Sequence, residues 1–253
     1  MKKILALVLT LAILCIGICS CASNDEKITI ATSPDFPPFE DLNNGEYVGI
    51  EMDLVKLVCE KLKLKYEFVS VDFDSIVTGV QAGKFTVGAA GISVDEDRKQ
   101  NVDFATEYCL AAQAIVVKAN STIKSKADLT GKTIAVQTAT TAEKYCSEQG
   151  YTINSYTANP DAELALSQGK VDAWVIDDLT ADAMVKEWNK THTGDDALVV
   201  LKEAMTSEPY AFCFQKGSKY TKLFSDTIKE FIKDGTIKAL FDKYDAPYFQ
   251  PEV

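Results

Sequence analysis

One residue, Arg98, stands out among those that could recognise a charged ligand, because the other 25 of the 26 basic residues are lysines. An arginine guanidinium is a rigid, planar group that holds a carboxylate through two parallel hydrogen bonds, whereas a lysine ammonium is a point charge. The composition therefore indicates a carboxylate-binding role for Arg98. The alternative is an ordinary surface ion pair with a preceding acid, Asp95, Glu96 or Asp97.

Gly91 and Ser93 lie where further contacts to such a ligand would be expected. The run from Thr86 to Ser93 predicts a β-strand, and an acid-rich turn separates it from Arg98. Backbone groups at Gly91 and the hydroxyl of Ser93 would then lie at the carboxyl end of a strand, where open α/β sheets bind their ligands. This context favours ligand binding over a surface ion pair for Arg98.

Metal sites and catalytic arrangements have little support in the sequence. The only histidine is His192, and no cysteine pair has the Cys-x-x-Cys spacing of a zinc site. Cys59, Cys109, Cys146 and Cys213 are widely spaced, and we interpret them as small buried hydrophobic residues, with a disulfide as the alternative. His192 lies in a polar loop and is expected to be solvated. We therefore predict no catalytic residue, no metal and no cofactor.

Composition and charge exclude several classes of protein. The chain has 253 residues, of which 47% are hydrophobic and 25% charged, as in a globular protein of one and a half to two domains. Its formal charge of −11 at pH 7 argues against a nucleic-acid partner, since nucleic acids are held by basic surfaces. We expect a monomer.

Residues 1–20 predict a signal peptide. Two lysines precede an uncharged, mostly apolar run from Ile4 to Ile18, which is too short for a membrane-spanning helix. The run ends in Ile18-Cys19-Ser20-Cys21, which resembles a bacterial lipobox and predicts lipidation of Cys21. Residues 21–26 would then form a lipidated tether. The alternative is ordinary cleavage and free secretion.

Strand-like and helix-like segments alternate along the rest of the chain, which predicts an α/β fold. Strands are predicted over 27–32, 65–71, 86–93, 133–137, 171–176, 197–201 and 210–214. Helices are predicted over 50–62, 75–81, 161–168, 181–188 and, with a break at Asp234-Gly235-Thr236, 219–244. One more helix opens at Thr140-Thr141-Ala142-Glu143, where Thr140 has the position of an N-cap.

The segments form two α/β units of similar build. Their joins, near 114–117 and 209–214, are strand-like rather than rich in glycine and serine. Such joins predict two lobes on a hinge, with a small-ligand cleft between them. Lobe 1 would contain residues 27–114 and 210–253, and lobe 2 would contain residues 115–209.

The segment from Gly49 to Leu62, GIEMDLVKLVCEKL, resembles the signature of extracellular solute-binding proteins of family 3, the receptors for polar amino acids in ABC importers. The resemblance covers essentially the whole mature chain and continues in Phe36-Pro37-Pro38-Phe39-Glu40, Gly91-Ile92-Ser93 with Arg98, Val102-Asp103-Phe104 and Ala127-Asp128-Leu129-Thr130-Gly131-Lys132. It implies a two-lobed periplasmic-binding-protein-like fold of type II, with two hinge strands. It also implies a lipid-anchored, extracytoplasmic receptor that delivers an amino acid to the membrane subunits of an ABC transporter.

The resemblance further implies roles for individual residues. Arg98 would hold the α-carboxylate of the ligand, and Ser93 would join it through its hydroxyl and backbone N–H. The carbonyl of Gly91 would accept from the α-ammonium. Asp177, five residues after Asp172, has the spacing of the acid that pairs with the same ammonium.

Four more positions follow from the resemblance or compete with it. Thr141, with its neighbour Thr140, would meet the carboxylate from lobe 2, and a helix N-terminus there favours an anion in any case. Phe36 and Phe73 would enclose the ligand side chain. The alternatives are a helix cap for Thr141, a turn or cap for Asp177, loop packing for Phe36 and a core position for Phe73.

The identity of the ligand side chain is less constrained. Several family members that bind basic amino acids carry an acid where this chain has Ser33. Asp35 or Glu40 could replace that contact, and Gln137 is a neutral residue at a position that faces the ligand side chain. A polar amino acid is therefore favoured. A basic one is the alternative, through cation–π contact with two phenylalanine rings.

The alternative function is enzymatic, because some proteins of this fold are dehydratases acting on carboxylated ring substrates. Such an enzyme needs a positioned acid–base group in the cleft. Asp35, Glu40 and Asp177 are the candidates for it, and no nucleophile–base arrangement accompanies them. We therefore expect a receptor that closes on its ligand without turnover.

Overall fold

The structure is a computed structural model that describes residues 27–201, 203 and 205–252. The predicted signal peptide, the tether over 21–26 and the lipidation site Cys21 lie outside the described residues. None of the helices among those residues has both the length and the apolar character that are needed to cross a membrane. The helices are α2 (Ile50–Leu62), α3 (Asp74–Gln81), α4 (Glu96–Asn101), α5 (Thr141–Glu148), α6 (Asn159–Ser167), α7 (Asp178–Trp188), α8 (Lys219–Lys233) and α9 (Thr236–Lys243).

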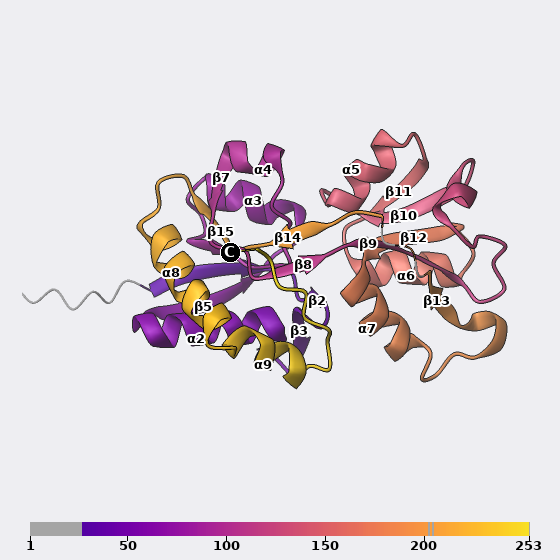
Figure 1. The fold of residues 1–253 in the computed structure, drawn as a ribbon. Helices are drawn as coiled ribbons and strands as arrows, with labels where there is room; N and C mark the ends of the chain where they lie inside the picture. Colours follow the sequence, from indigo (N-terminus) through magenta and orange to yellow (C-terminus); the bar gives the residue numbers. More distant parts are fainter. Residues whose placement is uncertain (1–26, 202, 204, 253) are drawn as a thin grey trace, which may run out of the picture.

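Two five-stranded sheets, each with its own helices, divide the molecule into two lobes (Figure 1). The lobe 1 sheet has the order β5 (Lys65–Ser70), β1 (Lys27–Thr32), β6 (Val87–Gly88), β15 (Cys213–Gln215), β7 (Val102–Phe104). The lobe 2 sheet has the order β11 (Thr152–Tyr156), β10 (Thr133–Gln137), β12 (Ala173–Asp177), β9 (Gln113–Lys118), β13 (Leu198–Val200). A small sheet of β2 (Asp35–Phe36), β3 (Glu40–Asn43) and β4 (Glu46–Val48) lies on the cleft side of lobe 1. The two-lobed architecture is the one that was expected.

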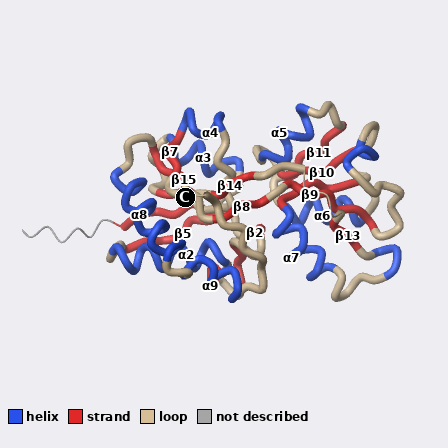
Figure 2. The backbone as a smooth tube through the Cα atoms, in the orientation of Figure 1, coloured by secondary structure: helices blue, strands red, loops and turns tan. Residues whose placement is uncertain are grey.

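Two antiparallel strands, β8 (Cys109–Ala111) and β14 (Glu208–Tyr210), run side by side between the lobes (Figure 2). Their register pairs Glu208 with Ala111 and Tyr210 with Cys109. The chain enters the lobe 2 sheet at Gln113, slightly before the predicted join near 114–117. The sequence carries no signal for this short break, because residues 109–117 read as one apolar, strand-like run.

Helix α2 follows the predicted range of 50–62, because local pattern and packing agree there. Its apolar residues recur at helical spacing, and Ile50, Leu54 and Val58 are fully buried. The residue before the helix, Gly49, occupies the N-cap position and has a φ of 128°. The α2 N-terminus binds the preceding loop, since the N–H of Ile50 donates to Pro38 O at 2.8 Å.

Two predicted strands were wrong in extent. The strand expected over 86–93 is reduced to β6, because the chain turns at Gly91, where φ is 54°. Its remainder forms the wall of the cleft, with one bridge between Ser93 and Tyr210. The strand expected over 210–214 is divided, since β14 crosses between the lobes and β15 joins the lobe 1 sheet.

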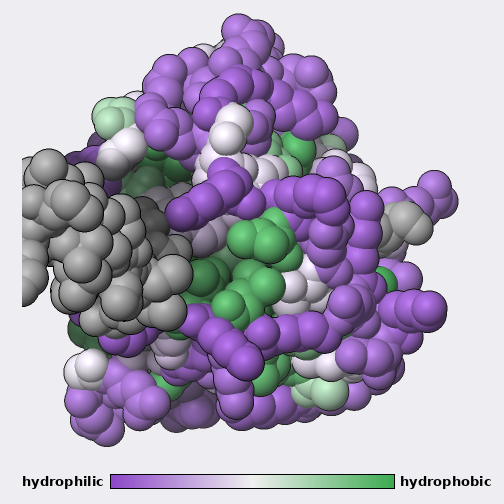
Figure 3. Space-filling view, turned by 90° about the vertical axis from the view of Figure 1, so that its left-hand side faces the viewer, coloured by the Kyte–Doolittle hydropathy of each residue, from purple (hydrophilic) through white to green (hydrophobic). Residues whose placement is uncertain are grey.

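The four described cysteines, Cys59, Cys109, Cys146 and Cys213, are all buried and free, which confirms their interpretation as small hydrophobic residues. Burial raises the pKa of the Cys59 and Cys146 thiols to about 12. The outer face of lobe 1 is mostly hydrophilic, with a small hydrophobic group near its centre (Figure 3).

Candidate functional site

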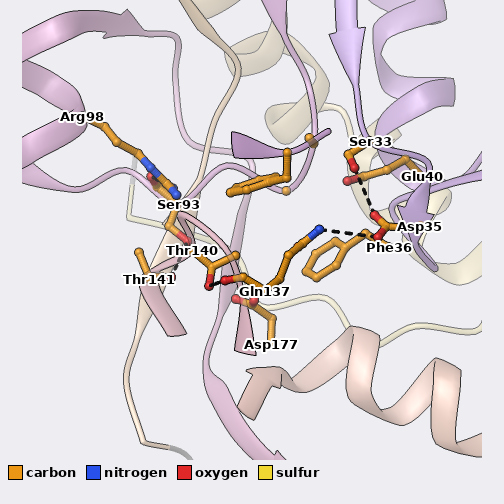
Figure 4. Close-up of a pocket in the computed structure, with 13 residues that line it drawn as sticks. Ser33, Asp35, Phe36, Glu40, Ser93, Arg98, Gln137, Thr140, Thr141 and Asp177 are labelled. Carbon is orange, nitrogen blue, oxygen red and sulfur yellow. Dashed lines mark hydrogen bonds between the residues drawn. The ribbon is translucent and has the colours of Figure 1, made fainter. Parts of the chain in front are cut away.

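The lobes enclose a cavity that is lined by every residue predicted to bind the ligand (Figure 4). The eight predicted residues lining it are Phe36, Phe73, Gly91, Ser93, Arg98, Thr140, Thr141 and Asp177. Five further residues complete the lining: Ser33, Asp35, Glu40, Ala90 and Gln137.

Arg98 projects from the short helix α4 toward lobe 2. Its Nη1 donates to Ser93 O at 2.9 Å, and its Nη2 donates across the cleft to Ala139 O at 3.0 Å. The guanidinium carbon lies 5.5 Å from the centre of the Phe73 ring. Asp95 caps α4 by accepting from the backbone N–H of Arg98 at 2.7 Å, and its carboxylate lies 4.0 Å from Nε. Arg98 therefore lies beside Asp95, as the ion-pair alternative requires, and it also faces the cleft, as ligand binding requires.

The N-terminus of α5 faces Arg98 from lobe 2. Thr140 is its N-cap, as predicted, since Oγ1 accepts from the N–H of Glu143 at 3.1 Å. Thr141 is the first residue of the helix, and its Oγ1 lies 3.4 Å from Ser93 Oγ in lobe 1. Thr141 also donates to a carboxylate oxygen of Glu208 at 2.6 Å. A helix N-terminus beside a guanidinium has the charge that an anion requires.

Asp177 ends the buried strand β12, and its side chain is turned into the cavity. It occupies the N-cap position of α7 but makes no side-chain cap hydrogen bond, which argues against the capping alternative. Its Oδ1 accepts from Gln113 Nε2 at 2.9 Å. Burial, followed by repulsion from Glu208, raises the pKa of Asp177 to about 7. A cation beside a buried carboxyl of this kind would favour its ionised form.

Phe36 packs into the loop and lines the cavity at the same time. Its ring stacks on Phe39 with the ring centres 6.0 Å apart. A Cβ at Gly91 would lie 2.7 Å from the Phe36 ring, so a side chain at that position would displace the ring. Gly91 therefore lines the cavity directly beside this ring.

Glu40 forms the opposite end of the cavity from Arg98 (Figure 4). Its side chain is fully buried, and neither carboxyl oxygen accepts from an N–H or hydroxyl group, so its one polar neighbour within hydrogen-bonding reach is the carboxyl of Glu51. Burial, followed by the neighbouring charge of Glu51, raises the pKa of Glu40 well above its ordinary value. Glu51, by contrast, accepts from the N–H of Gly91 and from the hydroxyl of Tyr108, both at 2.8 Å.

Sequence reasoning named Asp35 and Glu40 as possible replacements for an acid at the Ser33 position but could not place their carboxylates. Ser33 Oγ donates to Asp35 Oδ1 at 3.1 Å, so the serine orients the neighbouring acid. Glu51 was missed as a buried acid beneath the cavity. Its place in the α2 pattern marked it as a first-turn residue, and no sequence signal indicated the contacts with Gly91 and Tyr108.

His192 lies outside this cavity and is partly exposed to solvent. The ring is half-buried and stacks on Trp188, with ring centres 3.8 Å apart and planes 11° apart. The indole provides a flat partner four residues earlier on the chain. Across the residues that the structure describes, no three His, Cys, Asp or Glu side chains are grouped as a metal would require.

Residues 28–246 match the family described as bacterial extracellular solute-binding proteins, family 3. The ABC transporter arginine-binding protein 1 of Escherichia coli (strain K12) is 33% identical over 192 residues, which are 75% of this chain and 76% of that protein. The arginine-, lysine-, histidine-binding protein ArtJ from Geobacillus stearothermophilus has a TM-score of 0.82 and 30% identity, over 90% of this chain and 97% of that one. The ancestral amino acid-binding protein AncCDT-1, a precursor of cyclohexadienyl dehydratase, has a TM-score of 0.76 and 31% identity, over 86% and 95%.

Proposed function

Because the chain belongs to the bacterial extracellular solute-binding proteins of family 3, we propose that it captures a basic L-amino acid for an ABC importer. The observation that carries the choice of a basic ligand is Glu40, a fully buried carboxyl group at the far end of the cavity that accepts from no N–H or hydroxyl group of the protein and has only the carboxyl of Glu51 beside it. A ligand cation beside Glu40 would supply the missing donors and favour its ionised form.

The charges of the cavity complement such a ligand from end to end. The guanidinium of Arg98 and the α5 N-terminus face the position of the α-carboxylate. Asp177 is available to the α-ammonium, and Glu40 to a guanidinium or ammonium on the side chain (Figure 4). Burying these charges is unfavourable unless each has a partner, so the site selects a ligand that carries all three.

Lobe closure follows from the division of these contacts. Arg98, Ser93, Glu40 and Phe36 belong to lobe 1, whereas Thr141 and Asp177 come from lobe 2. A ligand that bridges the two sets stabilises the closed form and thereby changes the surface that the transporter meets. The neighbour that is described as a dehydratase precursor is itself an amino acid-binding protein, so we propose binding without turnover.

Lipidation of Cys21 is part of the proposal. The match of Ile18-Cys19-Ser20-Cys21 to a lipobox supports it, and an acyl anchor would hold a monomeric receptor near its transporter. Stable anchoring generally takes more than one acyl chain. Mass spectrometry of the membrane-extracted protein would detect the added lipid, and an unmodified Cys21 would contradict this part.

The assignment is tested by a binding screen. The purified protein is unfolded and refolded to remove any co-purified ligand, and thermal unfolding is then followed with each common amino acid. A ligand that binds only the native state raises the unfolding temperature in proportion to its affinity. Arginine, lysine or histidine should give the largest shift. A response to neutral amino acids alone would contradict a basic ligand, and no response at all would contradict the receptor function.

Glu40→Gln is expected to weaken the binding of the basic ligand by about tenfold or more, because a charge-assisted hydrogen bond contributes roughly 1.5–3 kcal/mol. Glutamine, a neutral amino acid of similar length, should lose little or no affinity. Isothermal titration calorimetry with both ligands measures the difference. Glu46→Gln, at an exposed position of β4, is the matched control. Equal losses for the two ligands would contradict the side-chain role of Glu40.

Asp177 is expected to make ligand binding dependent on pH. Its pKa is raised to about 7, so the group must release a proton below that pH before it can pair with the α-ammonium. Affinity should therefore fall as the pH is lowered below about 7, approaching about tenfold per pH unit. In the ligand-free protein the same group has the opposite effect. Stability falls as pH rises from about 4 to about 7, because only the native state still holds the proton.

Calorimetric titrations between pH 5 and 8 measure this dependence. Asp177→Asn should bind more weakly at pH 8 and should lose most of the change in affinity with pH. An unchanged pH profile in this variant would assign the dependence to another group.

A further inference from the structure

Helix α6 of lobe 2 has no capping side chain in its own lobe. The residue at its N-cap position is Ala158, and Pro160, in the first turn, has no N–H group. The N–H groups of Asp161 and Ala162 both point to Ala158 O, at 3.2 and 3.4 Å. The N–H of Asn159 is the remaining donor of the first turn, and its acceptor comes from lobe 1.

That acceptor is Asp35, on strand β2. Asp35 Oδ2 accepts from the N–H of Asn159 at 2.8 Å, and Gln137 Nε2 lies 3.4 Å from the same oxygen. Both partners belong to lobe 2 and are joined to each other, since Asn159 Nδ2 donates to Gln137 Oε1 at 3.0 Å. Asn159 is only 1% exposed. A lobe 1 carboxylate therefore completes a buried polar network of lobe 2, and Figure 4 shows its contact with Gln137.

Asp35 and Glu40 differ in one decisive respect. Both oxygens of Asp35 already accept hydrogen bonds from the protein, from Ser33 and from Asn159. Neither oxygen of Glu40 does. Of the two acids in this part of the cavity, only Glu40 therefore lacks N–H or hydroxyl donors, which a ligand cation could supply.

We propose that Asp35 is an interlobe cap. It is a positioning residue of lobe 1 that stabilises the closed form by accepting a hydrogen bond from the first turn of α6 in lobe 2. When the lobes separate, the Asn159 N–H loses this acceptor and the positive end of α6 loses its carboxylate. The proposal rests on the receptor function, because it is through closure that the cap affects ligand affinity. It assigns the ligand's side-chain cation to Glu40 alone.

Other contacts across the cleft are weaker candidates for this role. The ion pairs Asp97–Lys144 and Lys186–Asp245 join exposed side chains, for which water and salt screen the attraction. The Arg98 contact with Ala139 uses a group that the proposed ligand also requires. The Asp35 contact uses neither an exposed ion pair nor a group that the proposed ligand requires.

The cap is expected to act on all ligands alike. Observed affinity is the intrinsic affinity multiplied by the fraction of protein that is competent to bind, so weakening closure lowers affinity by the same factor for every amino acid. Asp35→Ala removes the acceptor and should weaken binding of arginine and glutamine equally, by about fivefold. Asp35→Asn keeps an oxygen acceptor, and asparagine caps helices about as well as aspartate. It should bind both ligands within about twofold of the native protein.

Calorimetry on the full chain with arginine and glutamine separates the two roles. A ligand-contact role predicts that Asp35→Asn loses as much as Asp35→Ala, and for arginine only; that result would overturn the proposal. The control is Asp41→Ala, which removes an exposed carboxylate. Asp41 lies opposite Asp35 in the register of the neighbouring strand, and this variant should bind normally. Thermal unfolding of each ligand-free variant shows that the fold is retained.

Failure of the receptor function would be visible separately, because the native protein would then bind neither amino acid. A native protein that binds, combined with an Asp35→Ala variant that binds equally well, would overturn the interlobe cap and leave the receptor function intact.

Discussion

Replacing Arg98 with alanine is expected to weaken the binding of every amino acid by well over tenfold, or about 2 kcal/mol or more, because a buried carboxylate would be left without its charged partner. The loss should be similar for basic and neutral ligands, since all share the α-carboxylate. Arg98→Lys should recover only part of it, because an ammonium cannot make two parallel hydrogen bonds. Calorimetry on the three proteins measures the series.

The fold should tolerate this change. Asp95 caps α4 through the backbone N–H of residue 98, and that bond does not need the guanidinium. Lys99→Ala, on the same helix and half-exposed to solvent, is the matched control for loss of a positive charge. If Arg98→Ala bound amino acids with near-native affinity, the carboxylate-binding role would be refuted.

Gly49→Ala is expected to give the largest loss of stability, about 3 kcal/mol or more in the free energy of unfolding. A Cβ at this position would lie 2.2 Å from Phe39 O and 2.5 Å from Phe39 C, which are backbone atoms and cannot rotate away. The φ of 128° adds strain for any residue other than glycine. Urea unfolding monitored by circular dichroism measures the change.

Gly45→Ala separates the two causes. Gly45 also has a positive φ, of 84°, but nothing lies within 4 Å of the position that a Cβ would take there. Its replacement should destabilise the protein by only about 1–2 kcal/mol, the contribution of left-handed backbone strain. Equal effects of the two substitutions would show that the contact with Phe39 is not decisive.

Local signals explain the parts of the fold that could be predicted. The helical spacing of apolar residues places α2, and the Thr140–Glu143 spacing marks the start of α5. Both depend on residues within one or two turns of each other. The rarity of arginine in the sequence likewise pointed to Arg98 before its surroundings were known.

The remaining features depend on contacts between distant segments. The Asp35–Asn159 hydrogen bond joins residues 124 positions apart, and nothing near Asp35 indicates an uncapped helix in the other lobe. Whether Glu40 has a donor likewise depends on which groups the fold brings around it. The shortened β6 shows the same limit, because cleft geometry and a turn at Gly91 override the strand-like composition of residues 86–93.

The buried state of the four described cysteines has a practical consequence for measuring closure. Thiols that are shielded from solvent and held in the protonated form react slowly with alkylating reagents. A cysteine introduced at an exposed position near the rim could therefore be coupled selectively to an environment-sensitive fluorophore. The labelled protein would report amino-acid concentration as a change in emission.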